Sequence, residues 1–89
     1  MKDRFRFSDS VLTSQVDDEL VLLDKGRGIY YGLNAMGHRM IALLLHHADA
    51  DVVADLVCRD YEAPPERVRG DLRGLVTDLL DRGLLSAQS

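Results

Sequence analysis

Three histidines and one cysteine are the side chains best suited to bind a metal or act as a nucleophile. His46 and His47 are adjacent, so they point in different directions on a helix, and His38 lies about two helical turns earlier. None of the spacings typical of zinc sites occurs. Cys58 has both acidic and basic neighbours and no evident base, which favours a structural or surface thiol. The sequence therefore predicts no metal site, no cofactor, no catalytic residue and no enzymatic activity.

The segment Lys25-Gly26-Arg27-Gly28 is the other candidate for chemistry, because glycine-rich loops can hold phosphate. It lacks the spacing of a phosphate-binding loop and precedes an expected strand rather than a helix. We interpret it as a tight hairpin turn whose glycines can adopt positive φ.

Composition limits the class of protein. The chain has 89 residues, of which 46% are hydrophobic, enough for one small domain with a packed core. Fifteen acidic residues against 11 basic give a net charge of -4, which argues against a nucleic-acid partner and favours a basic one. A single cysteine allows no intramolecular disulfide, and no apolar run is long enough to span a bilayer. We expect a cytoplasmic protein with no membrane partner.

The predicted elements follow the order β-β-β-α-α-α. Strands are expected at Val11 to Val16, Glu19 to Asp24 and Ile29 to Leu33, from their apolar and β-branched residues. Three helices then follow, the first capped by Asn34, the second by Asp49 or Asp51, and the third beginning at Pro64 or Pro65 and ending at Gly83. The fold class is therefore α+β, with a three-stranded antiparallel sheet followed by three helices.

The third helix carries a long apolar stripe and two internal glycines. Gly70 and Gly74 each cost about 1 kcal/mol relative to alanine in a helix interior. Close packing against another element is the preferred explanation, and room for a ligand backbone is the alternative. The stripe consists of Val68, Leu72, Leu75, Val76, Leu79 and Leu80.

Tyr30 and Tyr31 point to opposite faces of the third strand, so at least one is expected near the surface. If this strand lies at the edge of the sheet, its free amides and carbonyls can pair with an added peptide strand. The neighbouring helix would then supply apolar pockets for alternate side chains of that peptide. The pair therefore indicates a possible peptide groove.

The segment from Gly28 to Leu44, with Tyr30-Tyr31-Gly32-Leu33-Asn34 before a helix of small and apolar residues, resembles the PqqD family. Tyr61 and the ending Leu79-Leu80-Asp81-Arg82-Gly83-Leu84-Leu85 fit the same pattern, so the resemblance runs from about Val11 to Leu85. Met40-Ile41 departs from it, because many relatives carry an aromatic residue there. The chain looks most like the standalone leader-binding subunit of lasso peptide biosynthesis.

The resemblance implies a RiPP recognition element, which is a domain that recognises ribosomally made precursor peptides, with a winged helix-turn-helix-like fold. Such a domain binds the precursor's leader segment by strand addition between the third strand and the third helix. It would present the leader to a cysteine leader protease and an ATP-dependent cyclase. Lasso-type leaders commonly carry a Tyr-x-x-Pro element. Biosynthesis of pyrroloquinoline quinone, with a radical SAM enzyme as partner, is the other pathway that the resemblance leaves open.

These considerations lead to three predicted segments: a flexible N-terminal segment at 1–9, a peptide-binding domain at 10–85 and a C-terminal tail at 86–89. A winged-helix DNA-binding regulator and an adaptor module remain alternatives, because the same elements suit all three roles. Asp71 and Asp78 either attract a basic leader or are simply solvated surface residues. The candidate leader-binding residues are Ile29, Tyr30, Tyr31, Leu33, Val68, Asp71, Leu72, Leu75, Val76, Asp78 and Leu79.

Overall fold

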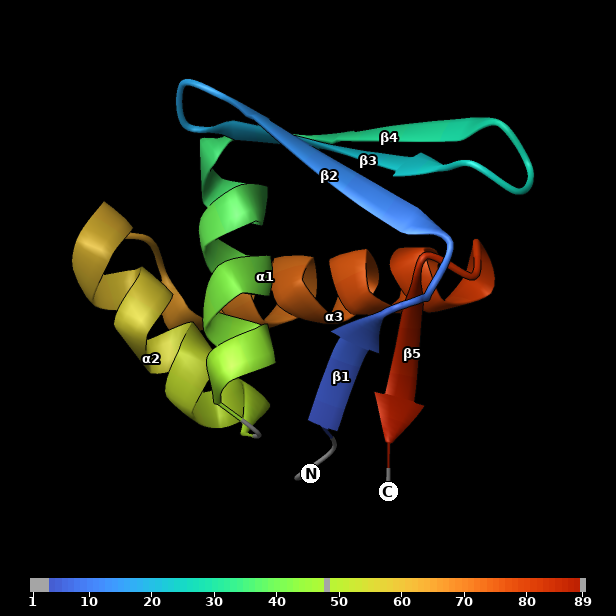
Figure 1. The fold of residues 1–89 in the computed structure, drawn as a ribbon. Coiled ribbons are helices and arrows are strands. Elements are labelled where there is room, and N and C mark those ends of the chain that lie inside the picture. Colours follow the sequence, from blue (N-terminus) through green and yellow to red (C-terminus); the bar gives the residue numbers. More distant parts are fainter. Residues whose placement is uncertain (1–3, 48, 89) are drawn as a thin grey trace.

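The computed structural model describes residues 4–47 and 49–88 and confirms the predicted α+β architecture. A three-stranded antiparallel sheet in the order β2-β3-β4 lies across one side of three helices (Figure 1). The elements are β2 (Val11–Val16), β3 (Glu19–Asp24), β4 (Ile29–Leu33), α1 (Ala35–His46), α2 (Ala50–Tyr61) and α3 (Pro65–Asp81).

The register of the sheet separates a helix-facing side from an outer side. Leu22 pairs with Tyr31 and Leu20 with Leu33, and these four side chains share the face toward the helices. Leu22 is completely buried, whereas Tyr30 on the outer face is 71% exposed. One face of the sheet therefore contributes to the core, and β4 lies at one edge of the sheet.

Local signals in the sequence place the helix starts where the structure has them. The Asn34 side chain accepts a hydrogen bond from the Gly37 amide at 2.8 Å, and Asp49 accepts one from the Asp51 amide at 2.9 Å. α3 begins at Pro65, where a missing amide hydrogen does no harm. The chain leaves α3 through Gly83 at φ +71°, as predicted, and Leu84 and Leu85 after it are buried in the core.

The two ends of the chain, where the sequence predicted a flexible segment at 1–9 and a tail at 86–89, each contain a short strand. β1 (Arg4–Phe7) pairs antiparallel with β5 (Leu85–Gln88), so that the ends lie side by side (Figure 1). Ser8 reinforces the junction, because its hydroxyl donates to the Gly83 carbonyl at 2.6 Å. This strand pairing joins residues far apart in sequence, so the alternation of charged and aromatic residues in Arg4-Phe5-Arg6-Phe7 could not by itself identify the partner strand. Residues 1–3 and 89 of the predicted terminal segments lie outside the described residues.

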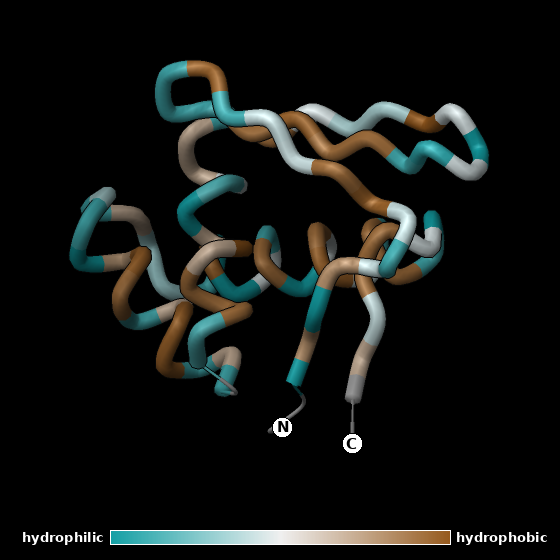
Figure 2. Tube along the Cα trace, in the orientation of Figure 1, coloured by the Kyte–Doolittle hydropathy of each residue, from teal (hydrophilic) through white to brown (hydrophobic). Residues whose placement is uncertain are grey.

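The core lies between the sheet and the helices. Figure 2 shows hydrophobic stretches along β3 and the helices, with hydrophilic residues at the hairpin turns. Within the described residues, no helix is long and apolar enough to cross a membrane. The largest fully buried side chains are Leu22, Ile41, Leu44, Val53, Val57, Val68, Leu79 and Leu84.

Two glycines in left-handed backbone allow a test of how α3 is joined to the sheet. Gly28→Ala should lower the free energy of unfolding by about 1–2 kcal/mol, from backbone strain alone at φ +66°. Gly83→Ala should cost more, because its new Cβ would lie 2.8 Å from an Arg27 guanidinium nitrogen. Urea unfolding of both variants measures the difference. An equal decrease in the free energy of unfolding in the two variants would show that the Arg27 side chain does not hold the end of α3.

Candidate functional site

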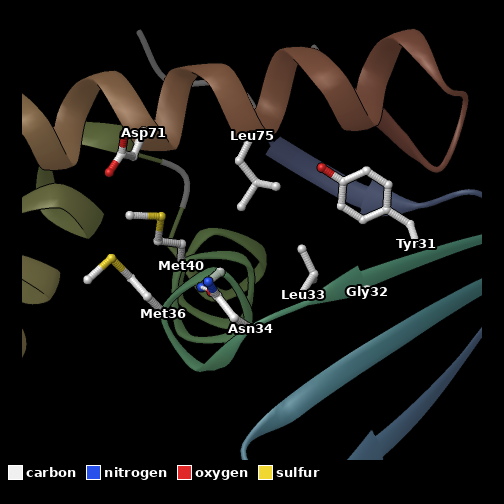
Figure 3. Close-up of a pocket in the computed structure, with 9 residues that line it drawn as sticks. Tyr31, Gly32, Leu33, Asn34, Met36, Met40, Asp71 and Leu75 are labelled. Carbon is white, nitrogen blue, oxygen red and sulfur yellow. Dashed lines mark hydrogen bonds between the residues drawn. The ribbon is translucent and has the colours of Figure 1, made fainter.

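A groove opens between β4, the start of α1 and the middle of α3, with a volume of about 250 Å³. Figure 3 shows Met36 and Met40 on α1, Leu75 on α3 and Leu33 on β4 around this space. We call it the β4–α3 groove. Its lining consists of Tyr31, Gly32, Leu33, Asn34, Met36, Gly37, Met40, Asp71 and Leu75.

The edge of β4 forms one side of this groove. β4 pairs with β3 and is the last strand in the sheet order, so its opposite edge carries backbone groups without a strand partner. Such an edge can accept an added strand. Leu33 and Met40 are buried at the floor, and the half-buried Leu75 forms an apolar wall on α3. The arrangement offers backbone pairing on one side and apolar contact on the other.

A polar network connects β4 to α3 beside the groove. The Tyr31 hydroxyl donates to an Asp78 carboxylate oxygen at 2.6 Å, and Arg82 Nε donates to the other carboxylate oxygen at 2.9 Å. The Arg82 guanidinium also lies 5.1 Å from the centre of the Tyr31 ring, within cation–π range. The hydrogen bond from Tyr31 and then that from Arg82 lower the pKa of Asp78, and the same contact with Asp78 raises the pKa of Tyr31.

A second network holds the β3–β4 hairpin against the C-terminal end of α3. Asp24 is a buried carboxylate, 2% exposed, that accepts hydrogen bonds from the Gly26 and Arg27 amides and from Arg27 Nε at 2.8 Å. The Arg27 guanidinium also donates to the carbonyl oxygen of Arg82. The bond with Arg27 lowers the pKa of Asp24 even though burial acts in the opposite direction. Both ends of this contact lie outside the groove, and it joins the β3–β4 hairpin to the end of α3.

The two acidic residues predicted to attract a basic leader have different environments. Asp71 lines the groove and is largely exposed, with Arg67 Nε at 3.8 Å. Asp78 is already engaged by Tyr31 and Arg82. Asp71 is therefore the carboxylate better placed to meet a cation entering the groove.

The structure brings only some of the predicted site residues together. Tyr31, Leu33, Asp71 and Leu75 line the β4–α3 groove. Ile29 is half-buried at the hairpin end of β4. The remaining positions lie elsewhere: Tyr30 on the outer sheet face, Asp78 in the network beside the groove, Val68 and Leu79 in the core, and Leu72 and Val76 at a second cavity.

Several groove residues were absent from the predicted set. Met36 and Met40 reach the groove from α1, and Asn34, Gly32 and Gly37 complete its lining. The helical spacing of Met36 and Met40 was evident in the sequence, but it indicated a core face. Only the packing of α1 against β4 and α3 turns these methionines toward the groove.

The two glycines of α3 are not closely packed against another element, which was the explanation that we preferred from the sequence. A Cβ at Gly70 or Gly74 would meet no heavy atom within 4 Å, so close packing does not explain either residue. Gly74 follows Asp71 by three residues and precedes Asp78 by four, which places it beside these two residues on the helix surface, next to the groove but outside its lining. Open space beside Gly74 is compatible with a ligand backbone approaching there.

The arginines of α3 bear on the alternative of DNA binding. Arg67 lies near Asp71, and Arg69 lies near Asp51 and Asp55, whereas Arg73 forms no ion pair within the described residues. Arg82, directly after the helix, lies near Asp78. These carboxylates reduce the positive potential that phosphate contacts require. A recognition helix of a DNA-binding protein would present its arginines without such partners.

The histidines and the cysteine have ordinary environments in the structure. His38 Nδ1 lies 2.9 Å from the Asp18 carbonyl oxygen, and the His46 and His47 rings meet edge to face at 4.9 Å. Cys58 is a half-buried free thiol. Within residues 4–47 and 49–88, no three side chains of His, Cys, Asp or Glu form a metal-binding cluster.

Comparison with known proteins identifies the class to which this fold and groove belong. Residues 19–85 match the family of coenzyme PQQ synthesis protein D (PqqD). The chain therefore belongs to the PqqD family, as its sequence resemblance suggested. A comparison with curated proteins gave no match.

Two solved structures share the whole fold. One is described as TbiB1 in complex with the TbiA(beta) leader peptide, with 33% identity, a TM-score of 0.82 and coverage of 94% of this chain and 98% of that chain. The other is described as lasso peptide synthetase B1 complexed with the leader peptide, with 29% identity, a TM-score of 0.86 and coverage of 93% and 98%. Both neighbours were thus solved with a leader peptide bound.

The acid dependence of stability tests the network beside the groove. The pKa of Asp78 is lowered in the folded state, so the ionised carboxylate stabilises the fold above its unfolded pKa of about 3.9. This contribution disappears as the pH falls through the lower folded-state pKa. Asp78→Asn should therefore lower the free energy of unfolding at pH 7. On acidification, the variant should lose less of this free energy than the wild type does. Urea unfolding of both proteins from pH 7 to pH 2 gives the free energy of unfolding at each pH. If the two free energies fall in parallel with pH, the assigned network is contradicted.

Proposed function

We propose that this protein binds the leader segment of a ribosomally made precursor peptide in the β4–α3 groove. The observation that carries the proposal is the open edge of β4 beside an apolar groove, in a PqqD family member whose structural neighbours were solved with leader peptides. The peptide-binding unit is the segment 10–85. The protein acts by binding and not by catalysis.

The leader adds as a strand to β4 within this proposal. Its backbone pairs with the free edge of the strand, which supplies register and affinity, while its alternate side chains enter the groove. The side chains of Leu33, Met40 and Leu75 offer apolar contact, and Met36 can adapt its shape to an aromatic residue. Asp71 receives a basic leader residue.

The networks at the far end of the groove reduce the cost of binding. Tyr31 and Asp78 join β4 to α3, and Arg27 joins the hairpin to the end of α3. A groove whose two walls are already fixed loses less conformational entropy when a peptide enters. We place this protein in lasso peptide biosynthesis, where it presents the leader to a cysteine protease and an ATP-dependent cyclase.

Fluorescence polarisation with labelled leader peptides tests the proposal. A leader that contains Tyr-x-x-Pro should bind saturably, and replacing its Tyr or Pro should weaken binding by about tenfold or more, the loss of roughly 1.4 kcal/mol. N-methylation along the peptide should weaken binding at every second residue, because alternate amides face β4 in an added strand. If N-methylation weakens binding without this alternation, strand addition is contradicted. If the folded protein binds no leader, the proposed function is contradicted.

A matched pair of variants locates the leader within that assay. Leu75→Asp places a charge in the groove and should abolish binding. Leu80→Asp makes the same change on the opposite side of α3, at a residue that is 37% exposed, and should leave leader binding unchanged. Circular dichroism confirms that both variants fold. Equal losses of leader affinity in the two variants would show that the leader does not bind in the groove.

The two glycines of α3 provide a further test, in which stability and binding should change in opposite directions. Gly70→Ala and Gly74→Ala should each stabilise the helix by about 1 kcal/mol, because both positions are open and helical. Gly74→Ala should nevertheless weaken leader binding, since its methyl group enters the space beside the groove, whereas Gly70→Ala should not. Thermal unfolding and fluorescence polarisation are measured on both. Unchanged affinity in Gly74→Ala would show that the leader does not approach this part of α3.

A further inference from the structure

A second, larger cavity lies on the other side of α3, with a volume of about 410 Å³. Pockets that bind small ligands or side chains commonly range from roughly 300 to 1,000 Å³. β1 and β5 form one wall, the end of α1 and the start of α2 form another, and α3 forms the base. Its main apolar residues are Phe5, Leu44, Leu72, Val76, Leu80 and Ala87.

This cavity is separate from the β4–α3 groove. The two share no lining residue. Asp71 and Leu75 point to the groove, while Arg73, Val76 and Leu80 point to the cavity, as expected for opposite faces of a helix with 3.6 residues per turn. A peptide in the groove therefore leaves the cavity free to bind something else.

The edge of the cavity carries both signs of charge, but only one of its two arginines lies beside carboxylates of the described residues. Arg69 and Arg73 line it together with Asp51, on a chain of net charge -4. Arg69 lies 3.8 Å from Asp51 and 3.9 Å from Asp55. Arg73 forms no ion pair with any carboxylate of the described residues. It is a cation available to an outside partner, next to an apolar cavity.

We propose that this cavity is a docking site for a segment of a partner protein that carries an apolar side chain next to a carboxylate. The apolar side chain enters between Phe5, Val76 and Leu80, and the carboxylate pairs with Arg73. The choice of a polypeptide as occupant rests on the proposed function, because a domain that presents a leader must contact a second protein while the leader is bound. The charge of Arg73 selects acidic segments over basic ones.

Capped dipeptides are suitable probes of this chemistry. Acetyl-Asp-Phe-amide, acetyl-Lys-Phe-amide and acetyl-Asp-Ala-amide are titrated into the uniformly ¹⁵N-labelled full chain, and amide shifts are followed by NMR. The Asp-Phe probe should shift Val76 and Leu80 saturably. It should bind about two- to fivefold tighter than the Lys-Phe probe, the ratio expected for one exposed ion pair. The Asp-Ala probe should bind more weakly than Asp-Phe, because it lacks the apolar anchor.

Charge reversal at the cavity provides the matched control. Arg73→Glu should invert the preference, so that Lys-Phe binds tighter than Asp-Phe. Arg59→Glu makes the same change at an exposed arginine of α2 outside the cavity and should leave the preference unchanged. The proposal is overturned by any of three results: no saturable amide shifts, shifts confined to residues of the groove, or equal affinity for the Asp-Phe and Lys-Phe probes. Tighter binding of octanoate than of Asp-Phe would assign the cavity to a free amphiphile and would also overturn it.

Leader binding is measured in parallel, so that the two proposals can fail separately. Arg73→Glu should bind a leader peptide with unchanged affinity, because Arg73 lies outside the groove. Loss of leader binding in this variant would contradict the independence of the two sites. If the wild type binds the Asp-Phe probe selectively but no leader, the proposed function fails and the cavity remains a site for acidic apolar segments.

Discussion

A buried carboxylate at the base of the β3–β4 hairpin holds the two walls of the groove in place. A charge taken out of water is costly unless hydrogen bonds and an opposite charge replace the lost hydration. Asp24 meets this requirement through two backbone amides of the turn and the Arg27 side chain. Arg27 in turn reaches the Arg82 carbonyl, so the hairpin and the end of α3 are connected through one residue. This contact links the turn that leads into β4 to the C-terminal end of α3.

The Tyr31–Asp78–Arg82 network makes a second connection between the same two elements. Because Tyr31 is in β4 and Asp78 is in α3, their hydrogen bond spans the gap next to the groove. The two connections, which meet at Arg82, leave the groove open where Leu33, Met40 and Leu75 line it. A rigid groove suits a domain that must recognise a flexible peptide, since ordering the peptide already opposes binding.

The arrangement of α3 explains how so short a chain can offer two surfaces. A small domain buries a limited fraction of its surface, so some apolar side chains remain accessible. One side of α3 borders the groove through Leu75, and the other borders the second cavity through Val76 and Leu80. Val68 and Leu79 lie between these two sides and are buried in the core, and Leu72 is buried at the second cavity. A peptide and a partner protein can therefore bind to opposite sides of one helix.

The sequence by itself determined the order of the elements from β2 to α3, because the signals for these elements are local. Asn34, Asp49 and Pro65 mark helix starts through backbone chemistry within one turn, and the apolar run of β3 identifies a strand covered by helices. Tertiary structure decided the pairing of β1 with β5. It also decided which apolar residues of α3 line the groove, which lie in the core and which line the second cavity. Spacing shows that Leu75 and Leu79 share a side of the helix, but only the position of β4 and α1 leaves Leu75 at the groove and buries Leu79. The contacts of Arg27 with α3 likewise join residues far apart in sequence, which no local pattern encodes.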